Sequence, residues 1–442
     1  MARPRKNAAK AQGSLLAPDE VAEIPVEEQP YPLPDGWKWV RLSSLCSLRN
    51  GKAFKPSDWS DSGLPIVRIQ NLNNPDSKFN YYNGHIEDKF LIKSGDLLFA
   101  WSGTPGTSFG AHIWLGEKAV LNQHIFRMDF EEKIILKSFF RYSINCRLEE
   151  LIAKAHGGAG LQHVTKGIFE STPIVLPPLD EQQRIVDRIE SLFAKLDEAK
   201  AKAEAVLDGF EIRKAAILHK AFTGELTERW REESKIQISS WKEEPISSLC
   251  HSLKYGTAKK SKEIGSTVVL RMGNLQDGEI DWSNLAYSDD QDDIQKYLLF
   301  PNDVLFNRTN SSELVGKTAI YRGECPAIYA GYLIKMDYKK NRLTGPYLNY
   351  VMNSHKAKEY CNNVKRDGVN QSNINAKKLG AFVIPVPSLP EQQEIVRILD
   401  NLLAKERHIR DAAENVQNQI ELMKKAILAR AFRGKLTRYI HN

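Results

Sequence analysis

The sequence lacks the features that mark membrane, secreted and zinc-finger proteins. No apolar run among its 442 residues approaches the roughly 18 that a membrane-spanning helix requires, and no hydrophobic leader follows the N-terminus. The five cysteines are odd in number, and none stands in a Cys-x-x-Cys pair. We therefore expect a cytoplasmic protein with reduced thiols, no metal site and no membrane partner.

Motifs of nucleotide-dependent and hydrolytic enzymes are also missing. The sequence contains no Walker loop, no Rossmann glycine fingerprint and no His-Glu-x-x-His, and nothing in it resembles a nucleophile elbow. The paired acids at 289–290 and 292–293 are typical of a solvated loop. These absences predict a non-catalytic chain without catalytic residues. A stand-alone nuclease or methyltransferase is one alternative, and a coiled-coil adaptor that binds only proteins is another.

What the sequence does contain is a long internal repeat. Leu179-Asp-Glu-Gln-Gln-Arg-Ile-Val returns as Leu389-Pro-Glu-Gln-Gln-Glu-Ile-Val, and the similarity continues to Thr227 and Thr437. The differences 389 − 179 and 437 − 227 are both 210, so nothing is inserted or deleted between the two copies. A repeat of this length indicates a duplicated structural unit.

Both copies carry apolar residues at alternating spacings of four and three, which is the pattern of helices that pair along a narrow seam. Arg213 interrupts the first seam and Glu406 the second. Each helix is predicted to follow prolines and to end at Gly224 or Gly434, so about 42 residues would form a rod of about 63 Å. We favour antiparallel pairing within the chain over two separate arms that dimerise with other chains, because the copies have equal length. The predicted seam residues are Ile185, Ile189, Leu192, Leu196, Ala199, Ala203, Val206, Phe210 and Ile217, and then Ile395, Leu399, Leu402, Ile409, Ala413, Val416, Ile420, Met423, Ile427 and Ala431.

Two globular segments alternate with these helices, and each reads as short strands and turns with some helix. A strand that runs into a polar loop is predicted at 64–72, and a turn that leads into a buried strand at 95–100. A further strand is predicted at 119–130 and a helix at 134–155. The second segment repeats the plan more loosely, with Asp96 matching Asp303 and the loop from Trp101 replaced by Arg308-Thr-Asn-Ser-Ser. The predicted fold is therefore α+β, with two α/β domains in tandem and an antiparallel coiled coil. The expected parts are a flexible tail at 1–33, domains at 34–178 and 241–388, helices at 179–227 and 389–442, and a linker at 228–240.

The charge and the loops point to a polyanionic partner. The formal net charge is +7 and the pI is near 8.9. Arg, Asn and Gln side chains can bind a base edge through two hydrogen bonds, whereas Lys holds phosphates. Loops rich in these residues recur at matching places in both segments. Each loop alone is better explained as an ordinary polar turn, so the case depends on the recurrence. The residues selected in this way are Arg68, Gln70, Asn71, Arg271, Asn274 and Arg308.

From about Gly36 to Tyr439 the chain resembles the specificity subunit of type I restriction-modification enzymes. The resemblance is carried by the Pro-Leu-x-Glu-Gln start of the first long helix, by its twin at Pro387, and by the two Ala-Phe-x-Gly-x-Leu-Thr segments near 221 and 431. It implies that each globular segment is a target recognition domain for one half of a split DNA sequence, and that the paired helices set the gap between the halves. The tail at 1–33 departs from the family pattern.

The resemblance also implies partners and further site residues. Two modification subunits and two restriction subunits would assemble with this chain and would bring S-adenosylmethionine, ATP and Mg²⁺, none of which this chain is expected to bind itself. Loops that lie near DNA in the family correspond here to Lys52, Gly158, Gly160, Gln162 and His163 in the first domain, and to Lys254, Tyr255, Lys365, Asn370 and Gln371 in the second.

Overall fold

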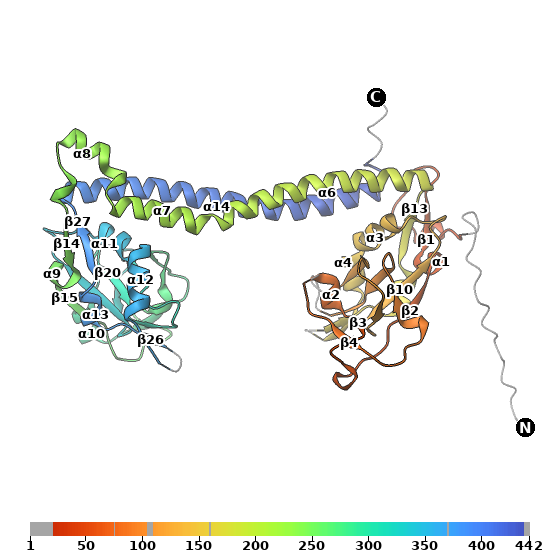
Figure 1. Ribbon diagram of the computed structural model, residues 1–442, viewed down its shortest axis with the longest axis horizontal. Helices are drawn as coiled ribbons and strands as arrows, with labels where there is room; N and C mark the ends of the chain where they lie inside the picture. The colour runs from red at the N-terminus through yellow and green to blue at the C-terminus, as the bar shows by residue number, and fades with distance from the viewer. Residues whose placement is uncertain (1–20, 75, 104–108, 159–160, 369–370, 437–442) are drawn as a thin grey trace, which may run out of the picture. The chain divides into compact units, whose positions relative to one another are not determined.

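The computed structural model describes residues 21–74, 76–103, 109–158, 161–368 and 371–436. The chain divides into two compact units, which we describe separately. Unit 1 comprises residues 1–201 and 416–442, and unit 2 comprises residues 202–415. Each unit therefore contains one globular domain and a part of each long helix (Figure 1).

The domain of unit 1 is built on three small sheets and one terminal strand pair. The pair joins β1 (Lys38–Arg41) to β13 (Pro173–Leu176) and so brings the two ends of the domain together. The central sheet is antiparallel, in the order β2 (Cys46–Asn50), β10 (Ile125–Phe130), β6 (Leu97–Ala100) and β8 (Gly110–Ile113). A second sheet has the order β4 (Asn80–Tyr82), β3 (Leu64–Val67), β9 (Ala119–Leu121) and β5 (Leu91–Ile92), and β3 runs parallel to β9. The third consists of β11 (His156–Gly158), β12 (Leu161–His163) and β7 (Ser102–Gly103).

Unit 2 repeats this strand order. The terminal pair is β14 (Lys242–Pro245) with β27 (Val383–Val386), and the central sheet is β15 (Cys250–Tyr255), β24 (Leu333–Tyr338), β20 (Val304–Asn307) and β22 (Thr318–Ile320). The sheet with the parallel pair is β19 (Ala286–Ser288), β16 (Thr267–Leu270) and β23 (Ala327–Tyr329), and a short pair joins β17 (Leu275–Gln276) to β18 (Glu279–Ile280). The third is β25 (Arg366–Asp367), β26 (Ser372–Asn373) and β21 (Thr309–Asn310). The internal repeat therefore includes the sheet topology as well as the helices.

Helices complete each domain. Those of unit 1 are α1 (Leu42–Leu45), α2 (Ile69–Asn73), α3 (Lys137–Cys146), α4 (Leu148–Ala153) and α5 (Lys166–Ser171), and those of unit 2 are α8 (Glu228–Ser234), α9 (Ile246–Leu249), α10 (Gln291–Tyr297), α11 (Gly345–Met352), α12 (His355–Val364) and α13 (Ala376–Gly380). The predicted strand at 119–130 is in fact two strands with a turn at 122–124, and the predicted helix at 134–155 is two helices. The turn at 122–124 is part of the candidate site of unit 1.

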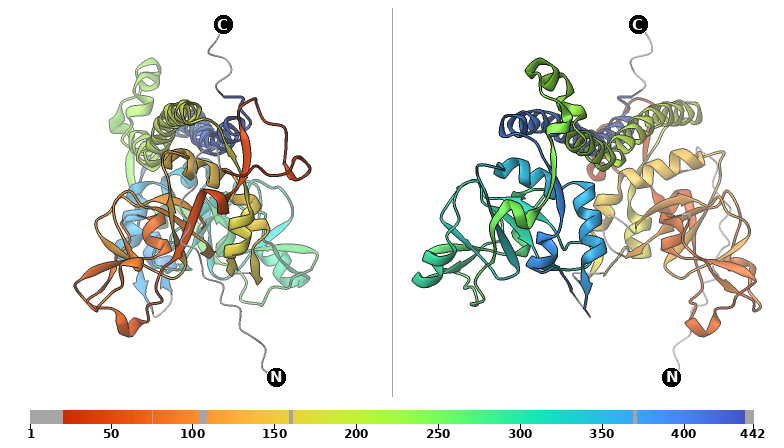
Figure 2. Two further views of the ribbon diagram at one scale, coloured as in Figure 1. Left: turned by 90° about the vertical axis from the view of Figure 1, so that its right-hand side faces the viewer. Right: turned by 60° about the vertical axis from the view of Figure 1, so that its left-hand side comes forward.

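The cores form where the domains meet their own long helices. Strands β6 and β20 are buried along their whole length, as their apolar residues predict, and the buried strand β20 ends in the polar Asn307. In unit 1 the core around Phe99 also takes in Ile185 and Ile189 from the long helix that follows the domain. In unit 2 the corresponding residues are Ile395 and Leu399. Because the first helical turns are packed into the domain core, each domain is firmly attached to its helix. Figure 2 shows the helices of each domain from two further sides.

The long helices are α6 (Leu179–Asp208), α7 (Phe210–Phe222) and α14 (Leu389–Ala431). The prediction of one helix across 179–227 is wrong in detail, because Gly209 separates α6 from α7 and residues 225–227 form a short 3-10 turn. The break is small, since Gly209 N still donates to Ala205 O at 3.2 Å. Glycine has no side chain to pack and a high conformational entropy in the unfolded state, which weakens the helix at this position.

The helices pair in antiparallel orientation within each unit, as predicted. In unit 1, Asp197 contacts Lys424 at 2.6 Å and Lys200 contacts Glu421 at 3.6 Å, so one residue number rises as the other falls. In unit 2, Arg213 Nε lies 2.8 Å from Glu406 Oε2. The two residues that interrupt the predicted seams are thus partners of each other.

Three predicted seam residues of α14 are exposed. Ile409, Val416 and Met423 are 44%, 42% and 49% exposed, whereas Ala413 and Ile420 are buried. A two-stranded pairing covers only one narrow stripe of each helix, and these three residues lie beside that stripe. They recur every seven residues along the same helix and leave an apolar stripe uncovered by the described residues.

Candidate nucleic-acid interface

In each unit one candidate site forms where several strands end together. The parallel strands β3 and β9 of unit 1 end side by side, and Asn122 N donates to Val67 O at 3.1 Å in the turn that follows. The central strand β6 ends at the same place, since Trp101 N donates to His124 O at 3.2 Å. Carboxyl ends of parallel strands are where side chains from separate loops converge in α/β sheets. The turn at 122–124 and the strand end at Trp101 therefore form one surface.

Unit 2 builds the equivalent surface with the same hydrogen bonds. Ala330 N donates to Leu270 O at 2.9 Å after the parallel strands β16 and β23. Arg308 N, after the central strand β20, donates to Tyr332 O at 3.0 Å. Tyr332 is exposed, so this turn reaches the surface of the domain.

The unit 1 site is an aromatic and histidine cluster. The ring of Trp101 stacks on Phe126 and lies 5.5 Å from His124 and 5.8 Å from His163, centroid to centroid. Ser102 Oγ lies 2.8 Å from His163 Nδ1, within hydrogen-bond distance. Burial, followed by the neighbouring His163, lowers the pKa of His124, which favours a neutral ring near pH 7. A cavity of about 350 Å³ adjoins the cluster, lined by Leu48, Asn50, Trp101, Phe126, His163, Val164, Thr165 and Lys166.

The unit 2 site is centred on an arginine. The guanidinium carbon of Arg308 lies 4.8 Å from the ring centroid of Tyr255. Arg308 Nη1 donates to Gly331 O at 3.4 Å, and Nη2 donates to Asn373 Oδ1 at 3.3 Å. Asn373 Nδ2 donates in turn to Thr309 Oγ1 at 2.7 Å. The hydroxyl of Tyr255 accepts from Ala376 N at 2.9 Å, so the ring beneath the guanidinium is itself fixed.

The two sites share a frame, by which we mean the same strand ends and the same cross-strand residue pair, and they differ in the chemistry of their side chains. The Ser102 and His163 pair of unit 1 joins β7 to β12, and the Thr309 and Asn373 pair of unit 2 joins β21 to β26 at the matching place. Trp101 occupies the position that Arg308 occupies in the other unit. One frame therefore presents an aromatic ring in unit 1 and a guanidinium in unit 2.

Two of the predicted DNA contacts are structural. Asn71 is buried, its Oδ1 accepts from Arg68 N, and its Nδ2 donates to Ser77 O and Lys78 O. Asn274 is buried in the same way, with Oδ1 accepting from Arg271 N and Nδ2 donating to Asp281 O and Asn284 O. Both amides have used their two N–H donors inside the protein. They cannot read a base edge, and they recur because both domains need the same turn.

The other predicted residues of unit 1 are only partly assembled. The backbone of Lys52 forms a parallel β-bridge with Asn122 beside the candidate site, and Lys52 Nζ lies 3.2 Å from Tyr82 Oη. Arg68 follows β3, and its guanidinium lies 5.5 Å from the ring of Trp59. Gln70 is exposed on α2. Gly158 and Gln162 lie on β11 and β12, whereas Gly160 falls outside the described residues.

In unit 2 the structure brings together Tyr255 and Arg308. Arg271 Nη2 instead donates to Asn284 Oδ1 at 3.0 Å, and Lys365 Nζ donates to Ser312 O at 2.9 Å. Lys254 is exposed near Asp337, and Gln371 is exposed in the β25–β26 turn. Asn370 falls outside the described residues. The residues selected from the sequence did not include Trp101, His124 or Asn373, although the loops around His124 and Asn373 have the composition of binding loops. The matching of the Trp101 and Arg308 loops was the available signal for them.

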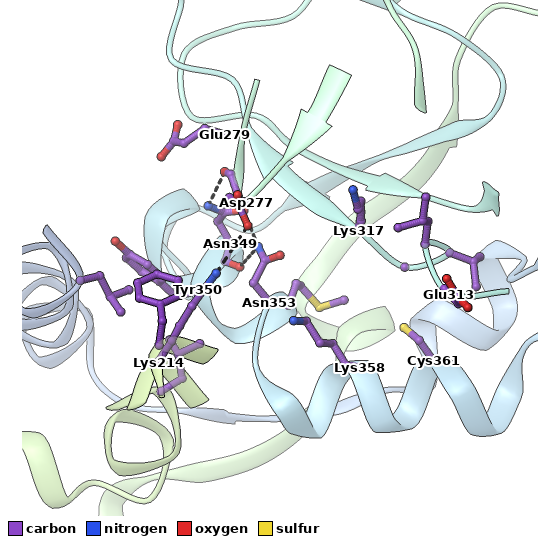
Figure 3. Close-up of a pocket in the computed structure, with 18 of the residues that line it drawn as sticks. Lys214, Asp277, Glu279, Glu313, Lys317, Asn349, Tyr350, Asn353, Lys358 and Cys361 are labelled. Atoms are coloured by element: carbon purple, nitrogen blue, oxygen red, sulfur yellow. Dashed lines mark hydrogen bonds and ion pairs between the residues drawn. The ribbon is translucent and has the colours of Figure 1, made fainter. Parts of the chain in front are cut away.

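A further cavity of unit 2 lies between the domain and its helices (Figure 3). It measures about 380 Å³ and lies between α7 and α14 on one side and α11 and α12 on the other. Lys214 Nζ lies 3.6 Å from the Asp277 carboxylate, and Asn349 donates to Gly278 O at 2.9 Å. Burial raises the pKa of the Cys361 thiol to about 11, which keeps it protonated. These contacts fasten the β17–β18 turn to the helices.

Among the described residues no group of three or more His, Cys, Asp and Glu side chains could hold a metal ion. In the same part of the chain, no helix is both long enough and apolar enough to cross a bilayer.

The fold is therefore a duplicated domain whose two copies share a strand order and differ in the side chains at one strand-end site. The model of the type I restriction modification DNA specificity domain matches residues 34–207 and 238–418. The chain belongs to this family of type I restriction-modification specificity proteins. The match confirms the predicted resemblance and its consequence that the chain is a specificity subunit and not a catalytic one.

Individual relatives agree over most of the length. The chain is 25% identical over 421 residues to the type I restriction enzyme EcoBI specificity subunit of Escherichia coli, covering 91% of this chain and 87% of that one. It is 27% identical over 424 residues to the EcoKI specificity subunit of Escherichia coli strain K12, covering 92% and 90%. The HsdS subunit from Thermoanaerobacter tengcongensis has a similar fold, with a TM-score of 0.59 at 20% identity, covering 92% of this chain and 99% of that one. A chain from a type I restriction-modification system studied for its complex assembly gives a TM-score of 0.72 at 20% identity, covering 92% and 100%.

Proposed function

We propose that this chain reads a bipartite DNA target, with one half-site for each globular domain and a gap set by the antiparallel helices. The observation that carries this proposal is the pair of strand-end sites, which share a frame and differ in chemistry. If both domains read the same sequence, the same side chains would be expected at Trp101 and Arg308. The net charge of +7 supports a polyanionic ligand.

We propose that catalysis belongs to partner subunits. Two modification subunits would bring S-adenosylmethionine for methyl transfer to adenine, and two restriction subunits would bring ATP and Mg²⁺, all in the cytoplasm where the DNA is. The exposed apolar residues Val416 and Met423 of unit 1 support a protein partner on this part of α14. The prediction of a flexible tail at 1–33 is wrong for its described part, because Val21 and Ile24 are buried in the core of unit 1 and Ile24 N donates to Trp39 O at 2.8 Å. Residues 1–33 have no role in this proposal.

Mapping of methylated adenines tests the bipartite target. Genomic DNA would be sequenced from cells that express the modification subunit with and without this chain. We expect a methylated motif with two specific halves separated by unread base pairs, present only with this chain. A continuous motif would contradict the two-domain proposal. The purified chain alone should transfer no labelled methyl group to DNA.

The spacing role of the helices has its own test. Asp197 and Lys424 contact each other across the antiparallel pair. Seven residues inserted before Asp197 and seven inserted after Lys424 would therefore lie side by side, lengthen both helices equally and preserve the seven-residue seam. Seven residues add about 10 Å, which is roughly three base pairs of duplex. We expect the gap to grow by about that amount while both half-sites stay unchanged. The control inserts the seven residues into α6 alone, which shifts the pairing and should abolish recognition of the longer site. Altered half-sites with an unaltered gap would refute the spacing role.

A further inference from the structure

We infer that the residue after the central strand, Trp101 in unit 1 and Arg308 in unit 2, selects one base pair of its half-site, and that Arg308 reads a guanine. The inference rests on the proposed function and assigns the recognition chemistry of the same sites. Each unit supplies its own evidence for this position.

Unpartnered buried atoms gather at this position in both units. Among the described residues, Trp101 Nε1 and His124 Nδ1 of unit 1 are buried without a hydrogen-bond partner. In unit 2 the same is true of Arg308 Nε and of Asn307 Nδ2, one residue before it. Buried polar atoms are nearly always paired in folded proteins, because an unpaired one destabilises the fold. Their presence at equivalent strand ends in both units indicates a site organised for a ligand.

The Arg308 guanidinium is held in a fixed orientation. Tyr255 lies against one face of it, and hydrogen bonds to Gly331 O and Asn373 Oδ1 fix its plane. Asn373 cannot rotate its amide freely, because its Nδ2 donates to Thr309 Oγ1. An arginine restrained in this way loses little side-chain entropy when it binds a planar ligand.

The remaining donors match one base. The two hydrogen bonds use one N–H on each terminal nitrogen of Arg308 and leave one further N–H on each. A planar fork with a donor on each terminal nitrogen fits O6 and N7 of guanine in the major groove, which no other base presents together as acceptors. The exposed rings of Tyr255 and Tyr332 border the site, so it is open to a duplex.

The unit 1 site lacks this fork. The indole of Trp101 carries a single donor, and His163 replaces Asn373 as the partner across the strands. A single donor cannot make the paired contact to guanine. We therefore expect the equivalent base pair of the first half-site to be selected by other chemistry, so that the two half-sites differ at this place.

Arg308→Lys tests the assignment, because lysine keeps the charge and loses the fork. The complex of the chain with its modification subunit would be assayed by methylation mapping and by competition among duplexes that vary each base pair. We expect preference for guanine at one position of the second half-site to fall by about tenfold or more. The other positions and the whole first half-site should keep their preferences. The matched control is Arg322→Lys, since Arg322 is an arginine of the same domain whose guanidinium faces Glu279, and the motif should not change.

A second variant separates misfolding from lost recognition. A misfolded domain would lose base preference at every position of its half-site. If Arg308 reads a guanine, Arg308→Gln should instead move the preference at that one position from guanine towards adenine, because a glutamine amide fits adenine. The inference is overturned if both variants retain the original motif, if the lost preference is for a base other than guanine, or if scrambled duplexes lose as much affinity as the cognate one. A wild-type complex without any split motif would instead refute the proposed function.

Discussion

A buried ion pair at the start of α14 offers a quantitative test of how unit 2 is held together. Glu391 is fully buried, and its Oε1 accepts from Arg231 Nη1 and Thr227 Oγ1, both at 2.8 Å. Its Oε2 accepts from Trp241 Nε1 at 2.8 Å. Arg231 also donates to Gly224 O at 2.7 Å. One carboxylate thereby fastens the whole segment between α7 and the second domain to the first turn of α14.

We expect Glu391→Gln to destabilise unit 2 by about 3 kcal/mol. Removing one member of a buried pair leaves the other charge without compensation, which typically costs about 3–5 kcal/mol. The lower end applies because Arg231 keeps its bond to Gly224 O and the glutamine oxygen can still accept one bond. An amide N–H₂ placed opposite Trp241 Nε1 or Thr227 Oγ1 cannot accept, so at least one donor there loses its partner.

Urea unfolding followed through hydrogen exchange of residues 224–245 measures the effect locally, which avoids the assumption that both units unfold together. The matched control is Glu394→Gln, one turn further along the same helix. Glu394 pairs with Arg397, whose side chain is 67% exposed, and such a pair contributes at most about 0.5 kcal/mol. In a double-mutant cycle, Arg231→Met combined with Glu391→Gln should cost less than the sum of the single variants, because no buried charge is left alone. A loss below about 1 kcal/mol for Glu391→Gln, or a loss equal to that of the control, would refute the reasoning.

Two further predictions concern single buried groups. Asn274→Ala should destabilise the second domain by about 1–3 kcal/mol, because it leaves Arg271 N and two carbonyls without their partner, and urea titration will measure this; retention of full stability would show that water replaces the amide. Burial and the neighbouring Arg141 lower the pKa of His112 from its usual value of 6.5. As the pH falls below 6.5, His112 therefore binds a proton in the unfolded chain before it does so in the folded chain. The free energy of unfolding accordingly falls as the pH is lowered. His112→Gln should reduce the loss of thermal stability between pH 7.5 and 5.5, whereas His85→Gln, at an exposed position, should not. If the wild type and both variants lost the same thermal stability over this range, His112 would not be the group responsible.

The long helices were the most predictable part of the chain. Heptad spacing predicted the pairing of the helices, although Ile409, Val416 and Met423 proved to lie beside the seam, and two copies of equal length imply pairing along their length. Arg213 and Glu406 could be recognised only as interruptions, because a sequence pattern does not give the partner of a residue 193 positions away. Gly209 was not recognised as the end of α6, since a single glycine inside a strong heptad pattern does not by itself predict a break.

The candidate site was predictable in composition and not in detail. Recurrence at matching places selected Asn71 and Asn274, yet their recurrence reflects the turn that both domains share. The same criterion passed over Trp101 as a site residue, because the two domains differ there. Repeated residues here indicate the turn that both domains share, whereas Trp101 and Arg308 mark a matching position at which the domains differ.

The sequence by itself determined the duplication, the two helices with their antiparallel seam, the α/β character of the domains and the family. These follow from local spacing and from similarity between segments, which are properties of the linear chain. Only the tertiary structure decided that Trp101 and Arg308 lie beside the ends of the parallel strands, that Arg308 lies between Tyr255 and Asn373, and that the two asparagines are buried. Those facts depend on strands distant in sequence ending side by side, and hydrogen-bond partners are chosen by that proximity and not by spacing along the chain.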